Sequence, residues 1–150
     1  MSSTEQLHRL GDKKWGAILN RFYSVARESI GGFSGQEVAT QGDAFFATFE
    51  GPARAIRCAG VIRDRSSREL DLEIRSGVHV GECERMGDNI GGITVHAAAR
   101  VCSQAQSGEI LVSSTVKDLA AGSGIEFEDR GLRTLKGLPE AVWLFAATRL

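Results

Sequence analysis

Asp43 is the first residue whose position suggests chemistry. It follows Gly42 between two short stretches rich in Val, Phe and Ala, which predicts a carboxylate at the tip of a β-hairpin. A carboxylate held at such a tip can bind Mg²⁺ through oxygen, with substrate phosphates completing the coordination shell. The alternative is a turn aspartate that hydrogen-bonds its own backbone, and the local sequence leaves both interpretations open.

A glycine-rich loop, Gly87 to Gly92, precedes a predicted helix that runs to about Ser103. Glycines let a backbone approach a ligand closely, and the free N–H groups at a helix start could hold a phosphate. His96 and Arg100 are four residues apart on that helix and share a face. Arg100 could stabilise charge that develops on a phosphate. Alternatively, the glycines serve packing and Arg100 is solvated, because the loop matches neither GxGxxG nor Walker A.

Two more polar residues stand out. Lys136 lies between Leu135 and Gly137 and could reach a phosphate, although a lysine on a surface turn is the ordinary case. His79 lies in a predicted strand, where a histidine more often has a structural hydrogen bond, and we assign it no catalytic role.

Composition narrows the class of protein. The 150 residues fit one domain, 1–150, and the 42% hydrophobic and 25% charged content is that of a globular chain. Lys plus Arg number 18 and Asp plus Glu 19, so the net charge of −1 predicts neither a nucleic-acid nor a membrane partner. No apolar run is long enough to cross a membrane. The three cysteines form no CxxC pair, which argues against a disulfide scaffold and favours the cytoplasm.

Apolar spacing and turn residues predict the elements that would position these side chains. An amphipathic helical pattern starts near Ser2, breaks at Gly11-Asp12 and ends at Gly31-Gly32. The remaining predicted elements are a hairpin within 36–49, a helix from Pro52, a strand from Leu70 to Cys83, the helix to Ser103, a strand at 109–113, a helix at 115–120, and strands at 125–129 and 141–147. This order predicts an α+β sandwich of ferredoxin-like type with its helices on one sheet face. It is unusual in that a helix comes before the first strand.

Seven short segments occur in a distinctive order: Ser3-Thr4-Glu5 with Leu10-Gly11-Asp12 and Trp15, then Thr40–Phe45, Gly77–Glu82, Asn89–Arg100, Ser107–Ser113, Phe127–Gly131 and Leu135–Gly137. Together they resemble the catalytic domain of class III nucleotide cyclases, the adenylyl and guanylyl cyclases. The resemblance covers nearly the whole chain and implies the cyclase variant of the ferredoxin-like α/β sandwich.

The resemblance also implies a reaction. The family converts a nucleoside triphosphate, here ATP in the first instance, into a 3′,5′-cyclic nucleotide and pyrophosphate. Two Mg²⁺ or Mn²⁺ ions held by two carboxylates assist the attack of the 3′-hydroxyl on the α-phosphate. The sites lie at a dimer interface, so a homodimer or a heterodimer with another cyclase domain is expected.

Matching the family's motifs residue by residue gives four candidate site residues. Asp43 matches the metal-binding aspartate of the hairpin, and Arg100 matches the arginine that stabilises the transition state. Lys136 matches the lysine that contacts the triphosphate. His96 stands where many members have asparagine, and we count it with Arg100 as a candidate catalytic residue.

Three departures from the family pattern follow. The family's first strand, with its metal-binding aspartate, has no counterpart, because the sequence starts at Met1 just past where that motif would end. The base-selecting lysine is replaced by Ala39, whose side chain cannot bond a base. Its usual aspartate partner is Asn89, which can still bond an adenine edge.

These departures predict a cyclase homology domain with a degenerate site that is weak or inactive as a homodimer. One lost metal carboxylate and one lost base contact lower the rate by more than about a thousandfold. Three alternatives stay open: a non-catalytic regulatory subunit that pairs with an intact cyclase, an active adenylyl cyclase whose true start lies upstream, and a purely structural fragment.

Overall fold

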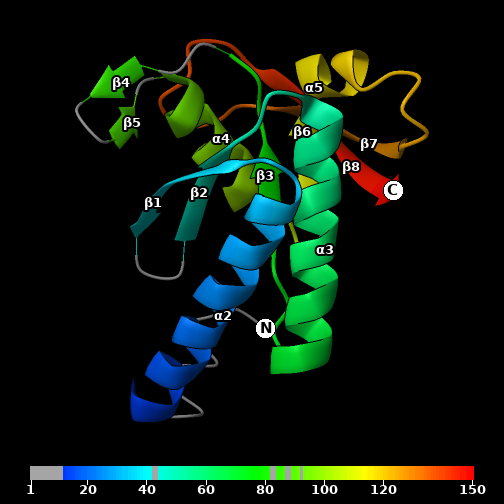
Figure 1. Cartoon of the computed structure of the whole chain (residues 1–150). Helices are drawn as coiled ribbons and strands as arrows, with labels where there is room; N and C mark the ends of the chain where they lie inside the picture. Colours follow the sequence, from blue (N-terminus) through cyan, green and yellow to red (C-terminus); the bar gives the residue numbers. More distant parts are fainter. Residues whose placement is uncertain (1–11, 42–43, 82–83, 87–88, 92) are drawn as a thin grey trace.

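The computed structural model describes residues 12–41, 44–81, 84–86, 89–91 and 93–150 (Figure 1). The helical pattern predicted before Gly11 and the predicted absence of the family's first strand concern residues outside these ranges. The elements in chain order are α2 (Asp12–Gly32), β1 (Gln36–Gln41), β2 (Ala44–Thr48), α3 (Pro52–Leu70), β3 (Ser76–Val78), β4 (Glu84–Met86), β5 (Asn89–Gly91), α4 (Ile93–Ser103), β6 (Ile110–Ser113), α5 (Ser114–Leu119), β7 (Glu126–Arg133) and β8 (Val142–Arg149).

The two long helices lie side by side and follow their sequence signals (Figure 1). α2 ends at Gly32, where the sequence predicts, but the left-handed residue that follows is Ser34, with a φ of 58°, and neither Gly31 nor Gly32 has the predicted left-handed conformation. α3 begins at Pro52, which suits the first turn because proline has no N–H to leave unpaired. Phe22 and Val25 of α2 pack in one buried cluster with Leu70 and Leu72 at the end of α3. The apolar faces of both helices are therefore used in the core.

β1 and β2 form the predicted antiparallel hairpin. Gln41 pairs with Ala44 across the tip, and Gln36 pairs with Thr48 at the open end. The two residues of the tip, which include Asp43, lie outside the described residues. The hairpin forms a two-stranded sheet of its own in the described part of the chain.

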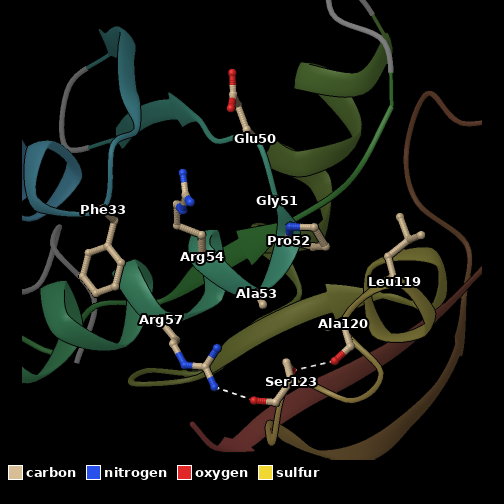
Figure 2. Close-up of a pocket in the computed structure, with 10 residues that line it drawn as sticks. All are labelled: Phe33, Glu50, Gly51, Pro52, Ala53, Arg54, Arg57, Leu119, Ala120 and Ser123. Atoms are coloured by element: carbon tan, nitrogen blue, oxygen red, sulfur yellow. Dashed lines mark hydrogen bonds between the residues drawn. The ribbon is translucent and has the colours of Figure 1, made fainter.

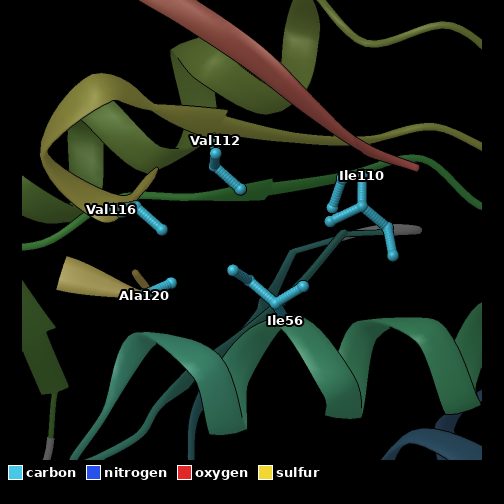
Figure 3. Packing of buried hydrophobic residues seen from close by; sticks show 6 residues of the cluster. Ile56, Ile110, Val112, Val116 and Ala120 are labelled. Atoms are coloured by element: carbon cyan, nitrogen blue, oxygen red, sulfur yellow. The ribbon is translucent and has the colours of Figure 1, made fainter. Parts of the chain in front are cut away.

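The central sheet has four strands in the order β3-β6-β8-β7. β3 runs parallel to β6, and the other neighbours are antiparallel. The four residues of β6 are all buried, and the first three alternate between two clusters. Ile110 and Val112 pack against Ile56 of α3 and Val116 of α5 (Figure 3). Leu111 packs on the other side against Val101 of α4.

Helices therefore cover both faces of this sheet, with α3 and α5 on one and α4 on the other. The α+β class is confirmed, but the expectation that the helices share one face is wrong. The alternation along β6 explains the difference, because both sets of side chains are apolar and each needs a covering layer.

Three predicted elements differ in extent. Among its described residues, the strand predicted from Leu70 to Cys83 pairs over β3 alone, because Leu72 is buried against the two long helices without joining the sheet. The predicted glycine-rich loop contains β5, which pairs with β4 as a small hairpin. β7 continues past Asp129, where Gly131 adopts a positive φ of 88° at a register shift.

No helix in the described ranges is both long enough and apolar enough to cross a bilayer.

Candidate active site

α4 carries two of the candidate site residues and is packed closely on β3. A Cβ placed on Gly77 of β3 would overlap the backbone of Cys102 and come within 2.8 Å of the carbonyl oxygen of Ala98. Only glycine allows this approach, since the obstacles are backbone atoms of the helix. Gly77 thus sets the distance between α4 and the sheet, and with it the position of His96 and Arg100.

His96 contacts the segment that carries Lys136. Its Nε2 lies 3.3 Å from the backbone carbonyl oxygen of Lys136, so Nε2 is the donor. The two residues are 40 positions apart in the chain. Lys136 itself is exposed, and its side chain is free to extend to a ligand. The structure thus brings together His96 and Lys136, which the sequence predicted only as separate candidates.

Arg100 lies one helical turn after His96 and is half-buried. Its Nε is buried and has no hydrogen-bond partner among the described residues. Unpaired buried donors are rare in folded proteins and call for an explanation, such as a ligand that completes the bond. Arg100 is therefore available for an anion on the side of α4 where His96 lies.

The candidate base-contacting residues lie on neighbouring strands. Ala39 is half-buried in β1, where it pairs with Phe46 of β2. Asn89 begins β5 and pairs with Met86. β1 contacts β5, so the structure brings the backbones of these two positions into the same region.

The candidate metal site falls at Asp43, outside the described residues. Within the described ranges, no three or more His, Cys, Asp or Glu side chains are grouped so that they could hold a metal ion. The carboxylate of Asp43 remains the one metal ligand that the sequence assigns.

His79 has the structural bond that the sequence analysis expected of it. Its Nδ1 lies 2.9 Å from the hydroxyl oxygen of Ser113, which joins the chain just after β3 to the end of β6. Burial lowers the pKa of the His79 imidazole, because the charged form loses its hydration. The ring is therefore held neutral and bonded within the fold.

Sequence reasoning missed one concave feature, a cavity of about 460 Å³ at the start of α3 (Figure 2). Arg54 and Arg57 line it, and Arg57 donates a 2.6 Å hydrogen bond to the carbonyl oxygen of Ser123. The two arginines after Pro52 were its only signal in the sequence. α3 and α5 cover the sheet face opposite α4, so the cavity is separate from His96 and Arg100.

Comparison with known proteins identifies the class. The family model of the adenylate and guanylate cyclase catalytic domain matches residues 2–147. The chain therefore belongs to this family, the class III nucleotide cyclases, and the resemblance seen in the sequence is confirmed.

Individual relatives and solved structures are similar to much of the chain. An uncharacterised protein of Mycobacterium tuberculosis is 30% identical over 107 residues, which are 69% of this chain and 37% of that protein. The adenylate/guanylate cyclase/hydrolase from Silicibacter pomeroyi is 26% identical, with a TM-score of 0.80 over 96% of this chain and 90% of that one. The guanylate cyclase domain of RhGC from Catenaria anguillulae, in complex with GTP, is 20% identical, with a TM-score of 0.82 over 99% and 91%.

The chain spans between 24% and 37% of the length of the curated relatives that it matches. Those proteins are thus considerably longer than the segment in which they match this chain.

Proposed function

We propose that this cyclase domain binds a nucleoside triphosphate at a site shared between two chains, and that as a homodimer it cyclises the nucleotide weakly or not at all. The observation that supports the site is the contact between His96 and the backbone of Lys136. It places the helix that carries Arg100 beside the turn that carries Lys136. Two cationic residues from distant parts of the sequence are thus carried by neighbouring elements, as a site for a triphosphate requires.

Each cation has a role in the reaction of the family. The 3′-oxygen forms a bond to the α-phosphorus and loses its proton, while the bond from the α-phosphorus to the pyrophosphate oxygen breaks. The ammonium of Lys136 binds the triphosphate as a point charge. The guanidinium of Arg100 donates hydrogen bonds to the α-phosphate oxygens, where negative charge increases during the transfer. Its unpaired Nε is a donor without a competing partner among the described residues.

Asp43 is the residue we assign to Mg²⁺ or Mn²⁺, because carboxylate oxygens are the ligands that these ions prefer. The bound ion would neutralise charge on the phosphates. We assign no second metal carboxylate among residues 1–150. The single assigned ligand is one reason to expect a slow reaction from residues 1–150 alone.

The second reason is the base pocket. Asn89 can bond an adenine edge, and this favours ATP over GTP as the substrate. Ala39 offers no side-chain hydrogen bond to the base, and a lost bond of this kind costs about 1–3 kcal/mol when its partner stays unpaired. We therefore expect poor discrimination between ATP and GTP as well as a low rate.

The test is to incubate the purified chain with ATP or GTP and Mn²⁺ and to measure cyclic nucleotide and bound nucleotide separately. We expect nucleotide binding with little product. Ala39→Lys should raise the preference for ATP over GTP by about fivefold or more, because it restores a bond to the base. Rapid product formation by the unmodified chain would contradict the weak activity. Absence of any nucleotide binding would contradict the proposed site.

A further inference from the structure

We propose that His96 is a positioning residue: it holds the turn formed by residues 135–138 against α4, and so fixes where Lys136 can reach, without contacting the nucleotide itself. We call residues 135–138 the Lys136 turn. The inference rests on the proposed function, because it assigns Lys136 to the triphosphate. It departs from the sequence-based expectation that His96 acts on the substrate beside Arg100.

The Lys136 turn has a defined geometry. The N–H of Leu138 donates to the carbonyl oxygen of Leu135 at 3.1 Å, which closes a four-residue turn. Gly137, the third residue, has a φ of +85°, whereas Lys136 is not among the residues with positive φ. These features define a type II turn, which needs glycine at its third position. The carbonyl and the Cα–Cβ bond of Lys136 therefore have fixed directions relative to each other.

Apolar packing and one hydrogen bond join this turn to α4. Leu135 is buried in the same cluster as Val101, near the end of the helix, and Leu138 packs against that cluster. His96, about one and a half turns earlier on the helix, bonds the carbonyl oxygen of Lys136. Packing at Leu135 and Leu138 holds the two ends of the turn. The bond from His96 holds its middle, at the residue that carries the ammonium.

The ring of His96 is already occupied by the turn. A Cβ placed on Gly137 would lie 2.5 Å from Nε2, so the ring fills the space beside that glycine. Donation to the carbonyl oxygen of Lys136 uses the hydrogen on Nε2. Phosphate oxygens are acceptors, so they would compete with the turn for this donor. The Nε2 of His96 is thus suited to position the turn and is not available to a phosphate.

Glutamine and asparagine differ in length, and as replacements for His96 they form a matched pair of variants. The amide nitrogen of glutamine extends about as far as Nε2 of histidine, whereas that of asparagine extends only as far as Nδ1. His96→Gln should therefore keep the bond to Lys136, and His96→Asn and His96→Ala should lose it. Because all three replacements are uncharged, differences between the variants reflect whether the side chain at position 96 reaches the carbonyl oxygen of Lys136.

The first experiment needs no ligand. Amide hydrogen exchange of Leu138, whose N–H closes the turn, is measured in the wild type and in the three His96 variants. We expect exchange to become about twofold to tenfold faster in His96→Asn and His96→Ala, the range that one net hydrogen bond provides. His96→Gln should exchange at the wild-type rate. Wild-type exchange in His96→Ala would overturn the proposal.

The second experiment measures binding of inorganic tripolyphosphate, which has the phosphates without the base. His96→Ala should weaken binding about twofold to tenfold, and the His96→Ala/Lys136→Ala chain should bind no more weakly than Lys136→Ala. Additive losses would mean that His96 contacts the phosphates directly, and would overturn the proposal. Lys13→Ala, which removes an exposed lysine at the start of α2, is the control for charge and should bind as the wild type does.

The two experiments separate the inference from the proposed function. If the wild type binds no tripolyphosphate, the proposed function fails, whereas the exchange result still decides whether His96 holds the turn. If the wild type binds and exchange at Leu138 does not respond to His96→Ala, the proposed function stands and the inference fails.

Discussion

Arg100 buries its Nε without a hydrogen-bond partner in the described part of the chain. A buried donor of this kind lowers the free energy of unfolding by about 1–3 kcal/mol unless a partner compensates. Residues that destabilise the ligand-free fold are expected where a ligand must be bound. The stability lost through the unpaired Nε of Arg100 is therefore what a site for a phosphate ligand would lead us to expect.

Arg100→Met should separate these two effects. The methionine keeps much of the apolar length of arginine and has no donor, so we expect the free energy of unfolding to rise by up to about 1 kcal/mol. Binding of tripolyphosphate should weaken at the same time. Chemical denaturation with and without tripolyphosphate measures both. Arg54→Met, at an exposed position on α3, is the control, and a stability gain as large as that of Arg100→Met there would contradict the explanation.

His79 makes the stability depend on pH. Burial lowers its pKa below the ordinary value of 6.5, so the folded state favours the neutral ring. The unfolded chain takes up a proton more readily, and stability is therefore full above pH 6.5 and decreases as the pH falls through the folded-state pKa. We expect the free energy of unfolding of the wild type to drop between pH 7 and pH 5. His79→Asn, whose amide nitrogen reaches as far as Nδ1 and can still bond Ser113, should show a smaller drop in the same urea titrations.

Among the contacts between elements, that of α4 with β3 leaves no room for a side chain at Gly77. The Cβ of alanine at position 77 would lie 2.7 Å from the Cα of Cys102. Overpacking of this kind costs about 1–3 kcal/mol. Because the obstacle is backbone, the helix must move as a unit and take His96 and Arg100 with it.

We therefore expect Gly77→Ala to lower the free energy of unfolding by about 1–3 kcal/mol and to weaken nucleotide binding. Gly16→Ala is the matched control: it lies within α2, and nothing is within 4 Å of a Cβ there. Alanine in a helix interior should stabilise by about 0.5–1 kcal/mol, because glycine loses more backbone entropy. Equal stability of the two variants in urea denaturation would refute the close packing of α4 on β3.

The observed limits of the helices and strands show which local sequence signals were sufficient to predict them. Pro52 marks the start of α3 correctly, since proline restricts its own backbone to a helical φ. The Gly31-Gly32 pair marks the end of α2, but the left-handed residue there is Ser34. The alternation from Leu70 to Cys83 predicted too long a strand. Leu72 is buried by the helices. An alternation of apolar and polar residues indicates that one side of a segment is buried, but it does not indicate whether the segment pairs with another strand.

For the whole molecule, the decisive property is whether two chains form the site. In the proposed arrangement one chain supplies Asp43 and its partner supplies Arg100. A site that lacks either Asp43 or Arg100 is inactive, but the two residues come from different chains of the dimer. Mixed chains can therefore restore a complete site in the dimer.

We expect an equal mixture of Asp43→Ala and Arg100→Ala chains, each in the Ala39→Lys background, to recover about a quarter of the rate of Ala39→Lys alone. Half of the dimers are mixed, and each of these has one intact site of two. Cyclic AMP formation in Mn²⁺ measures the rate. A mixture no more active than its components would exclude a shared site, provided that sedimentation shows that the dimers form.

The family and the α+β class were determined by the sequence, because ordered short motifs and the spacing of apolar residues are properties of the chain itself. So were the hairpin, the long helices and the identity of the candidate site residues. The meeting of His96 with the carbonyl of Lys136 was decided by the tertiary structure, as was the covering of both sheet faces. These depend on residues 40 positions apart and on which strand a helix packs against, and local sequence preferences contain no information about such distant pairs.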